Sequence, residues 1–350
     1  MYKIILEQKE RVSKNRELVY NIIAIIVALI ISGIVLAMNG YNPFSAFAGM
    51  FQTTFGSTFG LTETVVKTIP LIFTGLSVAI ALNSKVWNVG AEGQLYIGAL
   101  WASWFALYMP TMPKIIGIPL ILIASMMGGA IWAFIPALLK MKFKMNEVIS
   151  TLLMNYVAIS ILNYFVYGPM KRSDNFPYSE DFPKEAIFSK IGSSNIHIGL
   201  IFAIALVLIL FYVLKYTKFG YELRVIGSSI KAAKYAGINY EKTMLFVFLL
   251  SGAFAGLAGA NQVCGIEHKL HTHISDSLGY TGIIVAWLAR SNPFIIVGFA
   301  FFMSSLLIGS ESLQYEGIPV SIGKLMQSFI LFSILGSELF KNYKIKIKRR

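Results

Sequence analysis

Long apolar runs separated by polar stretches dominate this chain. A transmembrane helix needs about 20 consecutive, mostly apolar residues. Nine runs reach or approach that length, and because they are continuous rather than alternating, they predict helices and exclude a β-barrel. The runs cover residues 20–38, 64–83, 93–109, 115–139, 146–167, 198–214, 244–263, 293–308 and 322–339.

Two stretches depart from this pattern. Residues 39–62 carry no charge and are rich in Phe, Gly and Thr. This composition predicts an interfacial helix or a re-entrant segment at the outer face rather than an open loop. Residues 280–289 are apolar but too short to cross a bilayer as a helix. Counting them as one crossing, we expect an all-α, polytopic membrane helical bundle of about ten spans, with broken or short helices.

The charge distribution supports this arrangement. Charged residues make up 13% of the chain, whereas a soluble domain carries about 25%. The net charge is +13, and ten spans place 22 of the 30 Lys and Arg residues on the inner side. This bias predicts that both termini are cytoplasmic, because nine spans would put the basic tail outside. The positive charge therefore reflects orientation in the lipid bilayer, and we expect no nucleic-acid partner.

The same pattern predicts the domain organisation. A cytoplasmic N-terminal arm covers residues 1–19, a transmembrane domain covers 20–340, and a basic cytoplasmic tail covers 341–350. A basic cytoplasmic loop at 215–243 lies within the transmembrane domain. On the outer side, residues 168–197 form a polar loop with four basic and four acidic side chains.

Polar side chains enter the membrane region in two places. Asn88, Glu92 and Gln94 are set among closely spaced glycines between two spans. This pattern suits a broken helix that lines a cavity, or alternatively a tight cytoplasmic turn in which Glu92 caps the following helix. Asn155 and Asn163 lie near one face of the 146–167 span, where they either join helices or contact a substrate.

The cytoplasmic loop contains one short predicted helix at residues 228–238. Ser228 or Ser229 can cap its start, and Gly237 stands where a glycine ends a helix. Such a helix either docks into a partner or is an ordinary surface helix. In the next span, Gly252, Gly256 and Gly259 have the spacing that lets two membrane helices pack closely.

The sequence shows no pattern of catalytic, metal-binding or nucleotide-binding residues. No nucleophile–base set and no paired intramembrane carboxylates occur, so we expect no catalytic residues and no enzyme. His268, His271 and His273 share no common face in an outer loop, so a metal site is not expected. Residues 317–324 lack the spacing of a phosphate-binding loop, which excludes an ATPase. Apart from Glu92, the acidic and basic residues of the spans lie near span ends, which disfavours ion-coupled transport.

Four stretches carry a family resemblance: WNVGAEGQLYIGALWAS at 87–103, NEVISTLLMNYVA at 146–158, and residues 217–259 and 279–314. Together they resemble the permease subunits of ATP-binding-cassette importers for simple sugars, nucleosides and branched-chain amino acids, in the nucleoside-type branch. The resemblance implies a multi-pass protein of the bacterial plasma membrane that works by alternating access. It also implies three partners: cytoplasmic ATP-binding subunits that bind ATP and magnesium, a similar or identical second permease subunit, and an extracellular substrate-binding lipoprotein.

The resemblance further implies roles for individual residues. It identifies the 228–238 helix as the element that couples to the ATPase and favours nucleosides as substrates. A ribose-like simple sugar is the alternative, and an ion-coupled secondary transporter is the competing class. The predicted substrate pathway consists of Asn88, Glu92, Gln94 and Asn155, and the predicted coupling residues are Ser228, Lys231, Ala232, Ala233, Lys234, Tyr235, Ala236 and Gly237.

Overall fold

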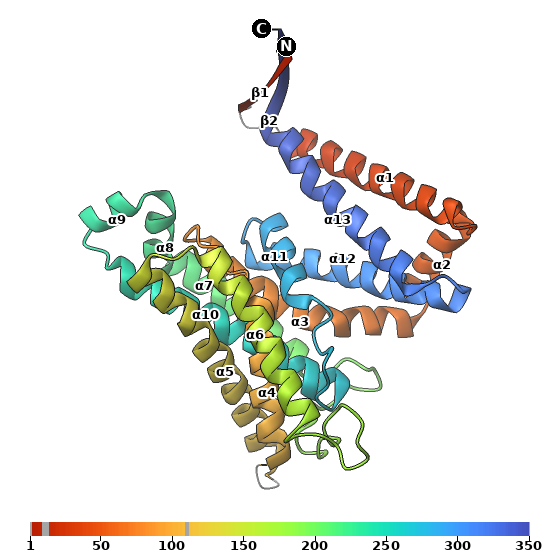
Figure 1. Ribbon diagram of the computed structural model, residues 1–350, viewed down its shortest axis with the longest axis vertical. Coiled ribbons are helices and arrows are strands. Elements are labelled where there is room, and N and C mark those ends of the chain that lie inside the picture. The colour runs from red at the N-terminus through yellow and green to blue at the C-terminus, as the bar shows by residue number, and fades with distance from the viewer. Residues whose placement is uncertain (1, 9–13, 109–111, 350) are drawn as a thin grey trace. The chain divides into compact units, whose positions relative to one another are not determined.

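The computed structural model describes residues 2–8, 14–108 and 112–349, and most of them lie in helices (Figure 1). The chain divides into two compact units. Unit 1 combines the two ends of the chain, Met1–Leu61 and Ser305–Arg350, and unit 2 consists of Thr62–Ser304.

Unit 1 is built on the packing of the first long helix against the last. Helix α1 (Lys14–Met38) lies along α13 (Val320–Asn342). The chain then turns by 118° into α2 (Pro43–Phe55), because Asn42 caps the new helix and proline occupies its first position. A 3₁₀ turn, η2 (Leu313–Glu316), contacts α2. The small apolar core of this unit consists of Leu36, Ala46, Leu313, Ile318, Ile322 and Met326.

The terminal segments of unit 1 form strands. Strand β1 (Tyr2–Gln8) pairs antiparallel with β2 (Tyr343–Arg349), with Ile4 opposite Ile347. The expectation of an all-α chain is therefore wrong for these two segments. Lysine and isoleucine alternate through residues 344–348, and this period of two favours an extended strand over a helix.

Unit 2 holds the remaining helices. Helix α10 packs against α5 and α4, and α6 packs on α4, so these four helices lie side by side (Figure 1). The elements are α3 (Thr58–Leu82), α4 (Ala91–Tyr108), α5 (Lys114–Phe143), α6 (Glu147–Tyr167), α7 (Gly199–Tyr216), α8 (Lys218–Ser228), α9 (Ile230–Tyr235), α10 (Tyr240–Ala260), the π-helix η1 (Asn261–Glu267), α11 (Leu278–Leu288) and α12 (Pro293–Ser312), whose last turns belong to unit 1.

Six helices of the described residues are long and apolar enough to cross a membrane, or seven if the bent pair in α1 and α2 counts as one span. The predicted polytopic helical membrane fold is thus confirmed. The count of about ten spans and the cytoplasmic position of both termini stay predictions. Three predicted crossings, α4, the 11-residue α11 and α13, are not among these six helices, and α1 enters the count only through the bent pair.

Glycine brings the backbones of α10, α5 and α4 close together. A Cβ atom added at Gly256 would overlap the carbonyl oxygen of Ser125 on α5, and one at Gly252 would overlap that of Gly129. A Cβ at Gly259 of α10 would overlap the carbonyl oxygen of Leu95 on α4. All three glycines that the sequence singles out for packing therefore lie at backbone contacts.

Candidate functional site

Helix α4 begins deep within the helical bundle. The chain leaves α3 at Leu82 and enters α4 only at Ala91. At that entrance, the N–H of Gly93 donates a hydrogen bond of 2.9 Å to Oδ1 of Asn155. Asn155 follows the first residue of α6 by eight residues, which is about 12 Å along a helix axis. The start of α4 therefore lies well inside the membrane region, as expected for a broken helix.

The connection between α3 and α4 is fixed by a buried amide pair. Asn88 and Gln94 exchange two hydrogen bonds, of 2.8 Å and 3.1 Å. Asn88 Nδ2 also donates to the hydroxyl of Ser251 on α10 at 2.8 Å, and Ser251 in turn bonds to the carbonyl oxygen of Ser77 on α3. This network joins three helices, and its polar groups satisfy one another.

Asn155 connects α6 to two other elements. Its Oδ1 accepts from Gly93, and its Nδ2 donates to the carbonyl oxygen of Val89 at 2.9 Å and to the hydroxyl of Tyr280 at 3.1 Å. The side chain is fully buried. Asn155 thus supplies the N-terminal cap that α4 does not obtain from its own residues.

Glu92 caps a second helix. The backbone N–H of Gly279, the second residue of α11, donates a hydrogen bond of 2.7 Å to Glu92 Oε2. Ser277 stands at the N-cap of α11 but has φ +72° and makes no side-chain cap. A carboxylate at a helix N-terminus is stabilised by the unpaired N–H groups and by the helix dipole. Glu92 therefore adds a cap from α4 to the local one, in which the Ser275 hydroxyl accepts from Leu278 N–H at 3.1 Å.

These contacts close a three-helix ring of Asn155, Glu92, Gly93, Gly279 and Tyr280. A side chain of α6 caps α4, and a side chain of α4 caps α11. The ring closes where the hydroxyl of Tyr280 on α11 accepts a hydrogen bond from Asn155 on α6. Glycine is required at the α4–α11 contact, because a Cβ at Gly279 would overlap the backbone nitrogen of Glu92. The ring fixes the positions of two helix ends within the membrane region.

The four predicted pathway residues all lie within this interior. Their exposed fractions are 1% for Asn88, 3% for Glu92, 1% for Gln94 and 0% for Asn155. The sequence located the polar cluster but not its partners. Gly279, Tyr280 and Ser251 were not predicted to contact it, because the chain brings them there from distant segments.

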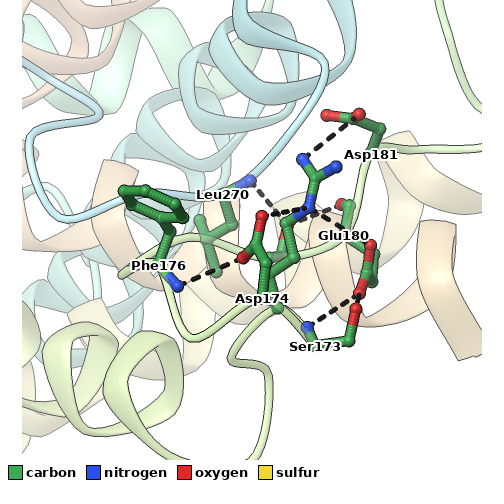
Figure 2. Close-up of polar contacts among 8 residues, drawn as sticks. Ser173, Asp174, Phe176, Glu180, Asp181 and Leu270 are labelled. Carbon is green, nitrogen blue, oxygen red and sulfur yellow. Dashed lines mark hydrogen bonds and ion pairs between the residues drawn. The ribbon is translucent and has the colours of Figure 1, made fainter.

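The polar outer loop is organised around Arg172. Its guanidinium group pairs with Asp174 at 3.2 Å, Glu180 at 3.6 Å and Asp181 at 3.5 Å. Figure 2 shows these acidic side chains gathered around one basic group, with Ser173 bonded to Glu180. We call Arg172 and its three acidic partners the outer clamp. These pairs are partly exposed, so they shape the loop more than they stabilise the fold.

The outer loop is bonded to the segment that follows α10. Ser179 and Leu270 exchange backbone and side-chain hydrogen bonds, both of 2.9 Å (Figure 2). Two residues before Leu270, the carbonyl oxygen of His268 accepts a hydrogen bond of 2.9 Å from Phe182 N–H. The loop therefore holds the start of residues 268–277, and Glu92 holds α11, which follows their end.

His197 lies buried where the outer loop enters α7. Its Nδ1 accepts from the N–H of Gly199 at 3.2 Å, and its ring lies against Gly265 of η1. Burial, and to a smaller extent nearby His268, lowers the pKa of His197 to about 4. The side chain is therefore neutral at ordinary pH.

The helix predicted at residues 228–238 is present over a shorter range, as α9. Ser229 is its cap, since its hydroxyl oxygen accepts from Ala232 N–H at 3.3 Å, whereas Ser228 ends α8 and its hydroxyl donates to Val225. Gly237 has φ +71° and ends the helix in the left-handed conformation.

The side chains of α9 differ in exposure. Tyr235 is 93% exposed, and Lys231, Ala232, Lys234 and Ala236 are exposed as well. Ala233 is buried at 0%. Its methyl group therefore packs inside this chain, and contact with a partner falls to the exposed members of the helix.

The histidines of the outer segment show no metal-ligand arrangement in the described residues. No group of three or more His, Cys, Asp or Glu side chains there could hold a metal ion. His271 instead lies 3.4 Å from a carboxylate oxygen of Glu267, one turn earlier.

Comparison with known proteins gives one family. The family described as "branched-chain amino acid transport system / permease component" matches residues 60–335. Among individual relatives, the chain is 33% identical to a glucose ABC transporter permease protein of Haloferax volcanii, over 93% of this chain and 89% of that protein. It is 30% identical to a nucleoside ABC transporter permease protein of Lactococcus lactis, over 92% of each chain. It is also 30% identical to a guanosine ABC transporter permease protein of Bacillus subtilis, over 97% of this chain and 99% of the relative.

Proposed function

Since the chain belongs to the family of branched-chain amino acid transport system permease components, we propose that it forms the translocation pathway of an ATP-driven importer of nucleosides. It is an ABC permease of the nucleoside and sugar branch and a multi-pass protein of the bacterial plasma membrane. The observation that carries the proposal is α9, a short capped helix that presents Tyr235 almost fully exposed.

Helix α9 is suited to transmit motion from ATPase subunits. A cleft on each cytoplasmic ATP-binding subunit would receive Tyr235 and the exposed alanines, and Lys231 and Lys234 would meet acidic groups or lipid headgroups. ATP and magnesium bind to those subunits. The buried Ala233 and the cap at Ser229 keep α9 rigid, so that a displacement of α9 moves α10 and α8, which it contacts.

The remaining partners follow from the transport cycle. A second permease subunit, identical or similar, completes the pathway, and an extracellular lipoprotein delivers substrate to the outer face. We propose the outer clamp as part of that docking face, because its three carboxylates outnumber the one guanidinium group. Both termini lie in the cytoplasm in this arrangement, which gives the chain an even number of crossings.

The buried polar residues act behind the pathway. We propose that Asn88, Gln94, Glu92 and Asn155 hold the ends of α4 and α11 in position, while side chains on the exposed side of these helices meet the substrate. Each of the four is engaged in hydrogen bonds within the chain.

A simple sugar is the alternative substrate, favoured by the similarity to the glucose-named relative. Ion-coupled transport is disfavoured, because Glu92, the deepest acidic candidate in the sequence, is engaged as the cap of α11. Uptake of radiolabelled guanosine and glucose separates these functions. Cells would express this chain with its ATP-binding and substrate-binding partners, and a matched strain would carry an inactive ATPase.

We expect guanosine uptake that disappears with the inactive ATPase. Glucose uptake with the same dependence would retain the importer and change its substrate. Uptake that persists without ATP hydrolysis, and collapses when the proton or sodium gradient is dissipated, would overturn the proposal.

A further inference from the structure

Residues 268–277 enter the membrane region without forming a helix. Their upper end is bonded to the outer loop through Leu270. Below it, the hydroxyl of Tyr96 on α4 lies 3.5 Å from the carbonyl oxygen of Thr272. The segment ends at α11, whose Gly279 is bonded to Glu92 at the level of Asn155. Irregular backbone at this depth is stable only inside protein or beside a water-filled cavity.

The lower end of this segment is exposed rather than inside protein. Asp276 and Ser277 both present exposed side chains. No basic side chain of the described residues pairs with the Asp276 carboxylate. An unpaired carboxylate is stable only where water or a polar group can meet it, because contact with lipid would cost several kcal/mol.

Two tyrosines lie beside the same surface. Tyr280 is half-buried on the first turn of α11, and its hydroxyl accepts a hydrogen bond from Asn155. Tyr156 follows Asn155 on α6 and is 61% exposed. Tyr156 is therefore the neighbour in sequence of the side chain that holds Tyr280 in place. An exposed tyrosine offers a flat aromatic face on which a ligand can stack.

We propose that Asp276, Tyr156 and Tyr280 form a recognition site for nucleosides within the pathway. The Asp276 carboxylate accepts hydrogen bonds from the ribose hydroxyl groups, and Tyr156 stacks on the base. Tyr280 borders the site and is positioned by Asn155. This inference rests on the proposed function and adds the substrate contacts to it.

Backbone geometry supports a functional role for this surface. Asp276 and Ser277 have φ +44° and +72°, in the left-handed region that non-glycine residues rarely adopt. Two such residues in succession persist only when their surroundings hold them, and such positions cluster at functional sites. Here Glu92 holds Gly279, three residues after Asp276.

The test compares two nucleosides on one variant. Asp276→Asn keeps the size of the side chain but removes its charge, and competition for uptake would be measured with guanosine and with 2′,3′-dideoxyguanosine. We expect the KM for guanosine to rise about tenfold, the loss of one charge-assisted hydrogen bond. The KM for the dideoxy compound should stay unchanged, since it has no ribose diol for Asp276 to bind.

Tyr156 is tested by its ring. Tyr156→Phe should retain the KM for guanosine, because stacking needs only the aromatic face, and Tyr156→Ala should raise it about tenfold. Tyr212→Ala on α7 is the matched control, since Tyr212 has the same exposed fraction of 61%. Membrane abundance and ATPase activity of each complex would verify that the variants fold and assemble.

The outcomes separate this inference from the proposed function. If the unmodified importer takes up guanosine but Asp276→Asn changes both nucleosides equally or neither, the site is wrong and the function stands. The same conclusion follows if Tyr156→Ala behaves like Tyr212→Ala. If the unmodified importer takes up no nucleoside, the proposed function and this site fail together.

Discussion

Glu92 on α4 and Gly279 on α11 are joined by a hydrogen bond of 2.7 Å, although 187 positions separate them in the chain. One carboxylate thereby supplies the N-terminal cap of a helix that begins inside the membrane region. Charge at a helix N-terminus usually comes from the residues just before it. Here the cap is a tertiary contact, so the position of α11 depends on the position of α4.

Removal of this charge should destabilise unit 2. In Glu92→Gln, the amide still reaches Gly279 N–H, but the interaction with the helix dipole is lost, and we expect Tm to fall by about 2–4 °C for about 1 kcal/mol. Thermal unfolding of the purified protein in detergent measures this effect. Glu185→Gln, at an exposed position of the outer loop, serves as the control. Equal Tm values for the two variants would contradict the capping role.

The glycine contacts predict opposite results at two positions. Gly256→Ala places a methyl group against the carbonyl oxygen of Ser125 and should lower Tm, since α10 must move away from α5. Gly298→Ala on α12 meets no atom within 4 Å and should leave Tm unchanged or raise it, because alanine favours a helix. If Gly256→Ala matches Gly298→Ala in thermal unfolding, α10 and α5 are not held at backbone contact.

Tyr235 should be essential for coupling. Tyr235→Ala removes the most exposed ring of α9 without disturbing its cap, and we expect uptake and substrate-stimulated ATP hydrolysis to fall at least tenfold. Tyr315→Ala is the control, because Tyr315 is 91% exposed in unit 1.

Ala233 was predicted as a coupling residue as well, which would make Ala233→Asp another variant for this purpose. In the structure Ala233 is fully buried, so an aspartate there would also disrupt α9 itself. Normal coupling in Tyr235→Ala, at wild-type membrane abundance, would refute the role of α9.

The buried His197 should make the folding stability of the protein sensitive to acid. Its pKa is lowered to about 4 in the folded protein, below the ordinary value of 6.5, because the ring is buried and His268 is near. The unfolded chain therefore binds more protons between these two values, and stability falls as pH decreases from about 6.5 toward 4. Thermal unfolding against pH should show this loss in the wild type.

Two matched variants test whether His197 causes this loss of stability. His197→Gln should lose that part of the pH dependence, whereas His273→Gln, at an exposed position, should retain it. A pH profile that is the same in all three proteins would exclude His197 as the titrating group.

Short-range signals in the sequence predicted helix ends well. The predicted 146–167 span begins at Asn146, a residue type typical of a helix N-cap, and its side chain accepts from Val148 N–H. Ser229 and Gly237 bound α9, as their residue types indicated. These features depend on residues within one or two turns, so the local sequence contains the necessary information.

How deep a segment lies in the membrane, and which distant residues it contacts, were not predictable in the same way. The sequence placed His268, His271 and His273 in an outer loop, and the contact between Glu92 and Gly279 brings the end of the same segment near Asn155. Hydropathy cannot reveal this, because an irregular segment beside a cavity is as polar as an exposed loop. The terminal strands differ, since the alternation in residues 344–348 was visible and was interpreted only as a basic tail.

The pairing of α1 with α13 has a consequence for biosynthesis. About 280 residues separate the end of α1 from the start of α13. At a translation rate of about 5–20 residues per second, α1 resides in the membrane for roughly 15–55 s before its packing partner is made. Unit 1 therefore completes its assembly only after α13 has been made, and α1 must be shielded by lipid or by the insertion machinery until then.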